Sequence, residues 1–304
     1  MHLTRVGPLW LRRYAVFVVC CTFGLVIAGG LVTSNDAALS VPDWPLSWGH
    51  LVPTLEGGIR YEFAHRVTAM VVGLLTVGLA LAIHTQPALQ HPTPQSEPRP
   101  SGSVSSPGPK LAWAAVVIVL AQAALGGVVV RFLTPAWATI AHASLGQLFF
   151  AILVAICVGL FAGFGGVWAA LTLICTVALF TQTILGAGVR YGVVAPVVHI
   201  GGAVLATMLV MWTGLSILMR HMDNPKLRRP AMLLLSITFS QVFLGIAALM
   251  ARVAYAAAPQ PMPVMVLFTV AHVAVGSLAV GASVALAMLA GPDAFRVHGG
   301  MVTA

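Results

Sequence analysis

The sequence predicts an all-α integral membrane protein with eight transmembrane helices, arranged as two pseudo-symmetric four-helix bundles. Of its 304 residues, 59% are hydrophobic and only 7% are charged, whereas a soluble protein of this length carries roughly 25% charged residues. The mean hydropathy is +0.98. Eight apolar stretches each reach the length of about 20 residues that a helix needs to cross a bilayer. None shows the period-two alternation of a membrane β-strand, which favours helices over a barrel.

The expected spans follow one another along the chain at 13–33, 62–84, 111–131, 137–161, 165–188, 195–220, 230–252 and 264–290. Residues 1–84 and 111–161 then form a first half, and residues 165–290 form a second half. Residues 85–110 are rich in Pro, Ser, Gln and Gly, which predicts a disordered cytoplasmic linker, and residues 291–304 are expected to form a cytoplasmic tail. An outer loop over 34–61 contains two prolines and two tryptophans between Val41 and Gly49, and this composition indicates a structured flap at the membrane interface.

The net charge of +8 is better explained by membrane topology than by nucleic-acid binding. If the N-terminus lies in the cytoplasm, ten of the 15 Lys and Arg residues lie inside, and five lie toward the outside: Arg60, Arg66, Arg131, Arg190 and Arg252. This bias favours a multi-pass protein of the inner (plasma) membrane with both termini cytoplasmic. Because no small-residue cleavage site stands out after the basic N-terminal segment, the first span is expected to be retained.

The two halves have the pattern of an internal repeat. The segment from Gln122 to Gly126, Gln-Ala-Ala-Leu-Gly, recurs from Gln182 to Gly186 and from Gln241 to Gly245, while the first span has Leu25 to Gly29 at the equivalent place, without the Gln. Each even-numbered span begins with a histidine shortly after the chain re-enters the membrane. Because each half has an even number of spans, the halves should be related by an axis along the membrane normal.

The four histidines of these spans are the candidate metal ligands: His65, His142, His199 and His272. Each is followed four residues later, on the same helix face, by a small residue that leaves room for a flat group: Ala69, Gly146, Ala203 and Gly276. Neutral imidazole is a good ligand for heme iron, and helical bundles build cofactor sites from facing helices. Pairing by halves predicts two hemes side by side near the outer face. The alternatives are histidines hydrogen-bonded to a neighbouring helix, and zinc, which prefers a tighter tetrahedral cluster.

Glu62 distinguishes the first half, because it lies three residues before His65 on the same helix face, where the other three histidines are preceded by Pro196, Thr139 and Thr269. A buried carboxylate can relay protons, which predicts that the first half reacts and the second holds electrons; the alternative is a residue favoured by the helix dipole.

Four arginines at the level of the histidines are candidate partners for heme propionates, or ordinary interfacial residues: Arg66, Arg131, Arg190 and Arg252. The four cysteines all lie in spans without a CxxCH spacing, which excludes heme attachment through that motif.

Together these features resemble the heme A synthase family: Glu62-Phe-Ala-His65-Arg66 opening the second span, the repeated Gln-x-x-Leu-Gly segments, the Pro42-Asp-Trp-Pro-Leu46 loop and the four-histidine, eight-helix layout. The resemblance covers the chain apart from the linker. It implies oxidation of the C8 methyl of heme O to a formyl group, by successive hydroxylations and loss of water, giving heme A for heme-copper oxidases. It also implies that His65 and His142 flank the substrate heme with Glu62 essential nearby, and that His199 and His272 hold a permanent heme b.

The chain departs from the family at two positions of the outer loop. Many bacterial members carry cysteines where this chain has Val41 and Ser47, so no thiol–disulfide step can occur at that pair.

The partners expected are heme O, the lipid bilayer, a heme O synthase and a terminal oxidase or its assembly factors, while the electron donor, the oxygen source and the oligomeric state stay open. The rival functions are a bis-histidine cytochrome b that only carries electrons, a heme chaperone or transporter, and a transporter without heme.

Overall fold

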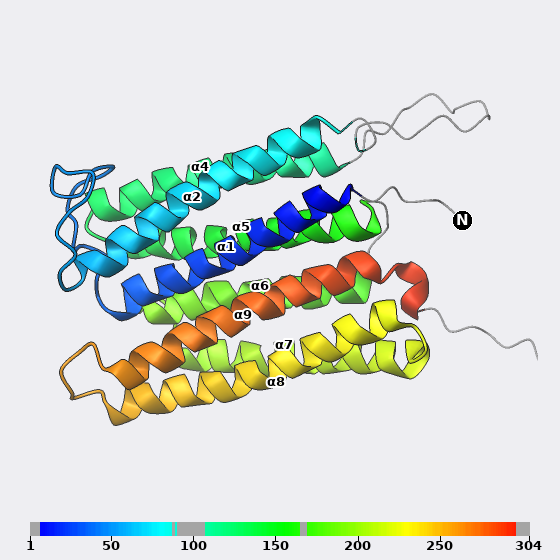
Figure 1. The fold of residues 1–304 in the computed structure, drawn as a ribbon. Helices are drawn as coiled ribbons and strands as arrows, with labels where there is room; N and C mark the ends of the chain where they lie inside the picture. The colour runs from blue at the N-terminus through cyan, green and yellow to red at the C-terminus, as the bar shows by residue number, and fades with distance from the viewer. Residues whose placement is uncertain (1–6, 87–88, 90–106, 165–168, 296–304) are drawn as a thin grey trace, which may run out of the picture.

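The computed structural model describes residues 7–86, 89, 107–164 and 169–295. Within these ranges eight helices are long and apolar enough to cross a membrane, which confirms the predicted all-α multi-pass protein (Figure 1). The helices are α1 (Leu9–Ser34), α2 (Ile59–His84), α4 (Pro107–Arg131), α5 (Ala136–Ala162), α6 (Ala170–Arg190), α7 (Pro196–His221), α8 (Pro225–Ala254) and α9 (Pro263–Leu289), and the 3-10 helix η1 (Pro292–Phe295) follows them.

The helix bounds differ from the predicted spans mainly at the ends that face away from the flap. Helix α8 begins at Pro225 rather than at 230, because the Asn224 side chain accepts a hydrogen bond from the backbone N–H of Lys226 (3.1 Å) and proline is tolerated in the first turn. Helix α4 begins at Pro107, inside the predicted 85–110 linker. Residues 87–88 and 90–106 of that linker, 165–168 of the predicted fifth span and 296–304 of the tail lie outside the described residues.

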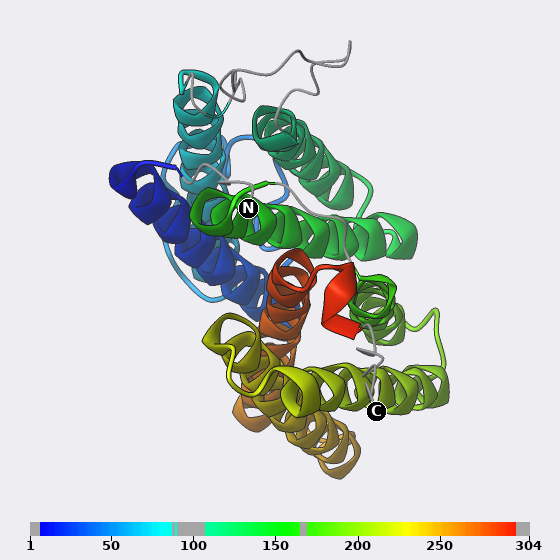
Figure 2. The same cartoon turned by 90° about the vertical axis from the view of Figure 1, so that its right-hand side faces the viewer.

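The helices form two rings of four. In the first half α1 packs against α2 and α5, and α4 packs against the same two helices; in the second half α6 and α8 each pack against α7 and α9. Figure 2 shows the two groups side by side, with the first half above the second. The halves meet through α1 and α5 on one side and α6 and α9 on the other. The same closed order of neighbours in both halves is consistent with the predicted repeat.

The apolar core of each half is concentrated toward one end of its bundle. In the first half fully buried side chains such as Leu11, Ile83 and Leu160 lie at the ends of their helices that are remote from the 35–58 loop, and Ile217 and Leu286 hold the same place in the second half. All four predicted histidines lie toward the other end, beside the loop, which we call the loop end (at the left of Figure 1). These fully buried apolar side chains therefore lie at the opposite end of the bundle from the histidines.

Candidate functional site

The structure brings the four histidines together in the two predicted pairs. In the first half His65 of α2 faces His142 of α5, with ring centroids 6.4 Å apart and ring planes at 76°. In the second half His199 of α7 faces His272 of α9, at 6.2 Å and 88°. In both halves the two helices occupy opposite corners of their ring, so each pair spans the interior of its bundle.

The separation within each pair fits one metal ion between the two rings. A metal–imidazole bond of about 2.1 Å on each side, plus about 1.2 Å from each nitrogen to its ring centroid, places two opposed imidazoles roughly 6.6 Å apart. The observed 6.4 and 6.2 Å are close to this value. Among the described residues no three His, Cys, Asp or Glu side chains come together as a metal cluster, so the histidines offer axial pairs rather than a tetrahedral site.

Each histidine packs against a glycine of the preceding helix. A Cβ atom built on that glycine would lie 3.2 Å from Cε1 of His65 at Gly29 and 3.3 Å from Cε1 of His142 at Gly126. The corresponding distances are 3.3 Å for Gly186 with His199 and 2.9 Å for Gly245 with His272. The glycine that ends each repeated segment thus allows its helix to approach the imidazole closely, and this contact holds the ring in place.

In all four imidazoles Nδ1 is buried and has no hydrogen-bond partner. The rings of His65, His142 and His272 nevertheless lie close enough to interact with the backbone carbonyls of Leu25, Gln122 and Gln241, respectively. Histidines that bind metals commonly direct their second ring N–H at such a carbonyl, which fixes the tautomer and the orientation of the ring. With Nδ1 toward the helix backbone, Nε2 of His65 and His142 is the nitrogen left for a metal, so these two residues fit axial ligands of heme iron. In the second pair, Nε2 of His272 lies 3.4 Å from the amide of Gln241, which would have to turn away for this histidine to bind a metal in the same manner.

Three glutamines of the repeated segments contact the helices that carry the histidines. Nε2 of Gln122 donates to the carbonyl of His142 (2.8 Å), and Nε2 of Gln241 lies 3.4 Å from Nε2 of His272. The same three amides lie against glycines one turn beyond the histidine: Gln122 on Gly146, Gln182 on Gly202 and Gln241 on Gly276. At Gly146 and Gly276 these side chains therefore occupy the space that the sequence suggested for a flat group. The sequence pattern contained a signal for the glutamines, since each recurs four residues before the glycine that ends its repeated segment.

Glu62 lies at the joint between α2 and the outer loop and is only 3% exposed. Its Oε1 accepts a hydrogen bond from Arg66 at 2.6 Å, and its Oε2 accepts one from the backbone N–H of Val41 at 2.8 Å. It is the one buried carboxylate among the described residues. Both of its oxygens bind protein groups that hold the loop, which sequence reasoning did not foresee.

Arg66 fastens the loop to α2. Its terminal nitrogens donate to the carbonyls of Asp43 (2.8 Å), Leu46 (2.9 Å) and Val41 (3.1 Å), in addition to Glu62. Both terminal nitrogens are thus used by protein acceptors, and only Nε stays available for a propionate. Charge-assisted bonds of this kind are among the stronger hydrogen bonds in proteins, so the loop is held as a structured flap.

Asp43 joins two parts of the flap by hydrogen bonds to residues five and six positions later in the chain. Its carboxylate accepts hydrogen bonds from the backbone N–H groups of Trp48 (2.6 Å) and Gly49 (2.8 Å), and these bonds lower the pKa of the carboxyl group below its usual value. The Trp44 ring lies on α4, where a Cβ at Gly127 would be 3.1 Å from the indole. Val41 and Ser47, the positions at which many family members carry cysteines, are both buried.

The other three candidate arginines differ among themselves. Arg190, at the end of α6, donates to the carbonyl of Thr33 and lies 3.5 Å from the carboxylate of Asp36, so it connects the second half to the end of α1 in the first. Arg131 and Arg252 are exposed, and within the described part of the chain they form no hydrogen bond or ion pair. Their side chains are therefore free to meet a ligand or lipid headgroups.

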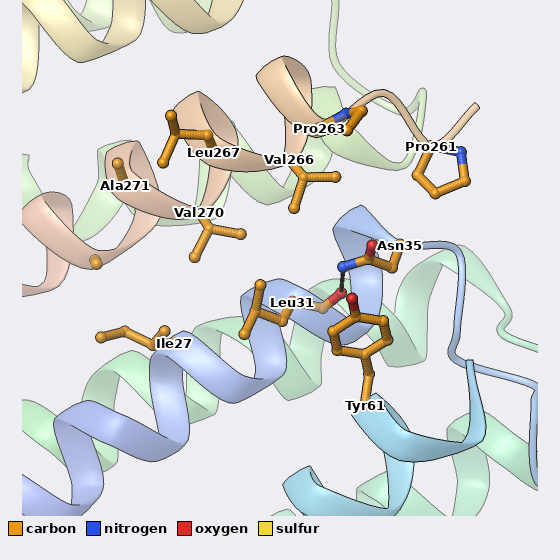
Figure 3. A pocket seen from close by; sticks show the side chains of 11 residues that line it. Ile27, Leu31, Asn35, Tyr61, Pro261, Pro263, Val266, Leu267, Val270 and Ala271 are labelled. Atoms are coloured by element: carbon orange, nitrogen blue, oxygen red, sulfur yellow. Dashed lines mark hydrogen bonds between the residues drawn. The ribbon is translucent and has the colours of Figure 1, made fainter. Parts of the chain in front are cut away.

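A cavity of about 470 Å³ lies between α1 and α9, at the junction of the two halves (Figure 3). Ile27 and Leu31 line it from α1, and Val270 and Ala274 line it from α9. At its loop end it meets the more polar side chains of Asn35 and Tyr61; the amide of Asn35 donates to the carbonyl of Leu31 (2.8 Å). The cavity thus lies between the two halves rather than inside either four-helix bundle.

No protein-family model matches the chain. Three curated proteins, each named heme A synthase, are similar to parts of it. The protein of Methylobacterium radiotolerans is 31% identical over 150 residues, which cover 45% of this chain and 36% of the relative. The proteins of Exiguobacterium sibiricum and of another Exiguobacterium strain are 37% identical over 75 residues and 38% identical over 85 residues; these cover 23% and 26% of this chain, and 25% and 28% of the relatives.

The matched segments thus span between about a quarter and about a third of the length of these relatives. The chain is related to the heme A synthase family.

Proposed function

We propose that the protein is a heme A synthase, which oxidises the C8 methyl group of heme O to a formyl group by successive hydroxylations and loss of water. The heme A formed would serve heme-copper oxidases. The observation that carries this proposal is the presence of two histidine pairs, each spaced for one iron atom, in bundles of the same construction. The name shared by the three relatives supports it.

The two pairs are proposed to have different tasks. His65 and His142 would flank heme O, because their half carries the buried carboxylate and the flap. His199 and His272 would hold heme b, which supplies one-electron transfer when bound. The flap, fastened by Arg66, would cover the loop end of the first half and limit the access of water to the substrate.

Glu62 is proposed as the residue that handles protons at the first site. It lies one helical turn before His65, and its Oε1 and Oε2 are buried where α2 meets the flap. A proton could reside on Oε2 when the flap moves and the N–H of Val41 withdraws from its present 2.8 Å. Arg66, which stays on the same helix, would then orient the carboxyl group through Oε1.

The cellular setting belongs to the same proposal. The charge bias of the sequence supports a multi-pass protein of the plasma membrane with cytoplasmic termini. A heme O synthase would supply the substrate, and a terminal oxidase or its assembly factors would receive the product.

The test is to co-express the protein with a heme O synthase and to identify the extracted hemes by chromatography and mass spectrometry. We expect heme A from the parent, and heme B with heme O or a hydroxylated intermediate from Glu62→Gln. Glu56→Gln, which changes an exposed carboxylate of the same loop, is the matched control and should produce heme A. A parent that binds heme B but yields no heme A despite ample heme O would refute the enzyme and favour an electron carrier.

A further inference from the structure

The cavity between α1 and α9 is a groove with two apolar walls and one polar end. Its wall on α1 runs from Ile27 to Asn35, and its wall on α9 runs from Pro263 to Ala274. At 1.5 Å per residue these walls are about 12 and 16 Å long. Leu267 of the α9 wall is 64% exposed, so the groove opens toward the surrounding lipid. The volume of about 470 Å³ is that of a site for a small molecule.

Two side chains at the loop end of the groove offer a hydrogen-bond donor and an acceptor. The hydroxyl of Tyr61 accepts a hydrogen bond from Arg60 (3.0 Å), so its own proton remains for a ligand. Asn35 uses Nδ2 to donate to the carbonyl of Leu31 (2.8 Å), and within the described residues its Oδ1 accepts no hydrogen bond. Figure 3 shows the Tyr61 hydroxyl directed toward the end of α1 that carries Asn35. This end suits a ligand that accepts one hydrogen bond and donates another.

The charges around this end favour a neutral ligand. Arg60 is exposed and lies over the Tyr61 ring, with its guanidinium carbon 4.8 Å from the ring centroid. On the other side Asp36 follows Asn35, and its carboxylate lies 3.5 Å from Arg190. A phosphate group at this end would therefore meet a carboxylate as well as arginines, whereas the hydroxyl and the amide favour neither sign of charge.

The floor of the groove lies between the two histidine pairs. Helices α1 and α9 touch at Gly30, where a Cβ atom would be 3.6 Å from Cγ1 of Val270. The neighbouring Gly29 contacts His65, and His272 follows Val270 by two residues. A helix with its side chains is about 10–12 Å across. A ligand in the groove would thus lie within about one helix width of each pair.

We propose that the groove binds an isoprenoid quinone, with its chain between α1 and α9 and its ring at Tyr61 and Asn35. The Tyr61 hydroxyl donates to a carbonyl of the quinone, and Oδ1 of Asn35 accepts from a hydroxyl of the quinol. The inference rests on the proposed function and deepens it by naming the electron donor. The quinol loses two electrons and two protons and becomes the quinone. The electrons pass one at a time to ferric heme b held by His199 and His272, and the protons pass to water at the loop end.

The binding test uses an azido derivative of decylubiquinone, photolysed with the full-length protein in phosphatidylcholine nanodiscs and mapped by mass spectrometry of peptides. We expect label on residues 27–35, 59–61 and 263–274, and excess decylubiquinone should remove it. Equal labelling of all lipid-facing helices would show partition into lipid and would overturn the proposal. Removal of the label by phosphatidylglycerol as effectively as by decylubiquinone would also overturn it, because the groove would then take phospholipids.

Four variants locate the quinone in the groove. Tyr61→Phe should weaken the competition by decylubiquinone about three- to tenfold, the contribution of one hydrogen bond. Tyr255→Phe, at the exposed end of α8, is its matched control and should behave as the parent. Ala271→Phe should fill the groove and abolish the label, whereas Val273→Phe, on the same turn but outside the cavity lining, should preserve it. Label that survives Ala271→Phe, or that is lost equally in both phenylalanine variants of α9, would exclude the groove.

Electron transfer is measured by mixing decylubiquinol without oxygen with the oxidised protein that contains heme B, and by following the absorbance of the reduced heme. Below saturating quinol, Tyr61→Phe should slow the reduction by the same factor as it weakens binding, and Tyr255→Phe should not. Label in the groove without reduction of heme would refute the electron donor.

Reduction of heme B by a quinol requires no oxidation of a methyl group, so the two proposals fail separately. If decylubiquinol reduces the parent but the parent makes no heme A from heme O, the proposed enzyme is refuted and the quinone site stands. If heme A is formed by a protein whose groove takes no label, only the quinone site is refuted.

Discussion

Gly29 of α1 lies so close to His65 of α2 that a Cβ atom at position 29 would be 3.2 Å from Cε1 of the imidazole. The same contact recurs at the other three histidines and is closest at Gly245, where the distance to His272 is 2.9 Å. Because glycine has no side chain, each imidazole can lie directly against the backbone of the preceding helix. The four contacts therefore define the orientation of the four ligands.

Gly29→Ala should weaken heme binding at the first site, because the methyl group pushes the imidazole out of line with His142. Overpacking of this kind costs about 1–3 kcal/mol, and Gly245→Ala should have the larger effect at the second site. Heme content and Soret spectra of the purified variants measure the outcome. Gly24→Ala, on the same helix and with nothing within 4 Å of the new Cβ, should resemble the parent; equal losses in both α1 variants would contradict the steric account.

Arg66→Lys should loosen the flap while leaving the helices intact. A lysine cannot reach the carbonyls of Val41, Asp43 and Leu46 together, and each hydrogen bond lost costs about 0.5–1.5 kcal/mol. Hydrogen–deuterium exchange of residues 41–50 should become faster in this variant. Arg131→Lys changes an exposed arginine of the same end and should leave exchange unaltered. Parental exchange in Arg66→Lys would show that other contacts hold the flap.

The helices and the histidine pairs could be predicted from sequence because both depend on local patterns. Hydropathy over about 20 residues marks a span, and the repeat placed the histidines at one level of alternate helices. The pairing of His65 with His142 then followed from the division into halves.

The contacts that hold the site could not be predicted in the same way, because they depend on tertiary packing. Glu62 binds the N–H of Val41, 21 residues earlier, and the path of the loop between them decides that contact. Arg190 reaches Thr33 across the junction of the halves, 157 positions away in the sequence. The roles of the glutamines depend on how each helix is rotated about its axis, and hydropathy does not specify this rotation.

Arg190→Gln should lower the stability of the protein by about 0.5–1.5 kcal/mol, the value of the hydrogen bond lost to the carbonyl of Thr33. The ion pair with Asp36 adds little, because its two charges are 3.5 Å apart and the Asp36 side chain is largely exposed to solvent. Thermal unfolding in detergent, followed by circular dichroism, measures the change. The control is Arg252→Gln, because Arg252 is the corresponding arginine of α8 and has no partner within the described residues. This variant should unfold at the same temperature as the parent. An equal drop in the unfolding temperature of both variants would indicate a general effect of charge.

Asp43 should make the flap sensitive to acid. Hydrogen bonds from the N–H groups of Gly49 and Trp48 lower the pKa of its carboxyl group in the folded loop, while in an unfolded loop the pKa is about 3.9. Because the folded-state pKa is the lower one, the stabilisation is complete above the unfolded-state value and is lost as the pH falls through the folded-state value. The flap should therefore be closed at neutral pH and open only in strong acid.

The tryptophan emission of the parent minus that of Trp48→Phe, recorded between pH 7 and pH 2, measures this transition. The difference signal should stay constant down to about pH 4, near the unfolded-state pKa, and then change as the carboxylate is protonated. Asn at position 43 keeps one acceptor oxygen but cannot titrate, so the same difference in an Asp43→Asn background should not vary with pH. If the signal of that background changes together with the parent, the transition belongs to another group, and Asp43 does not control the flap.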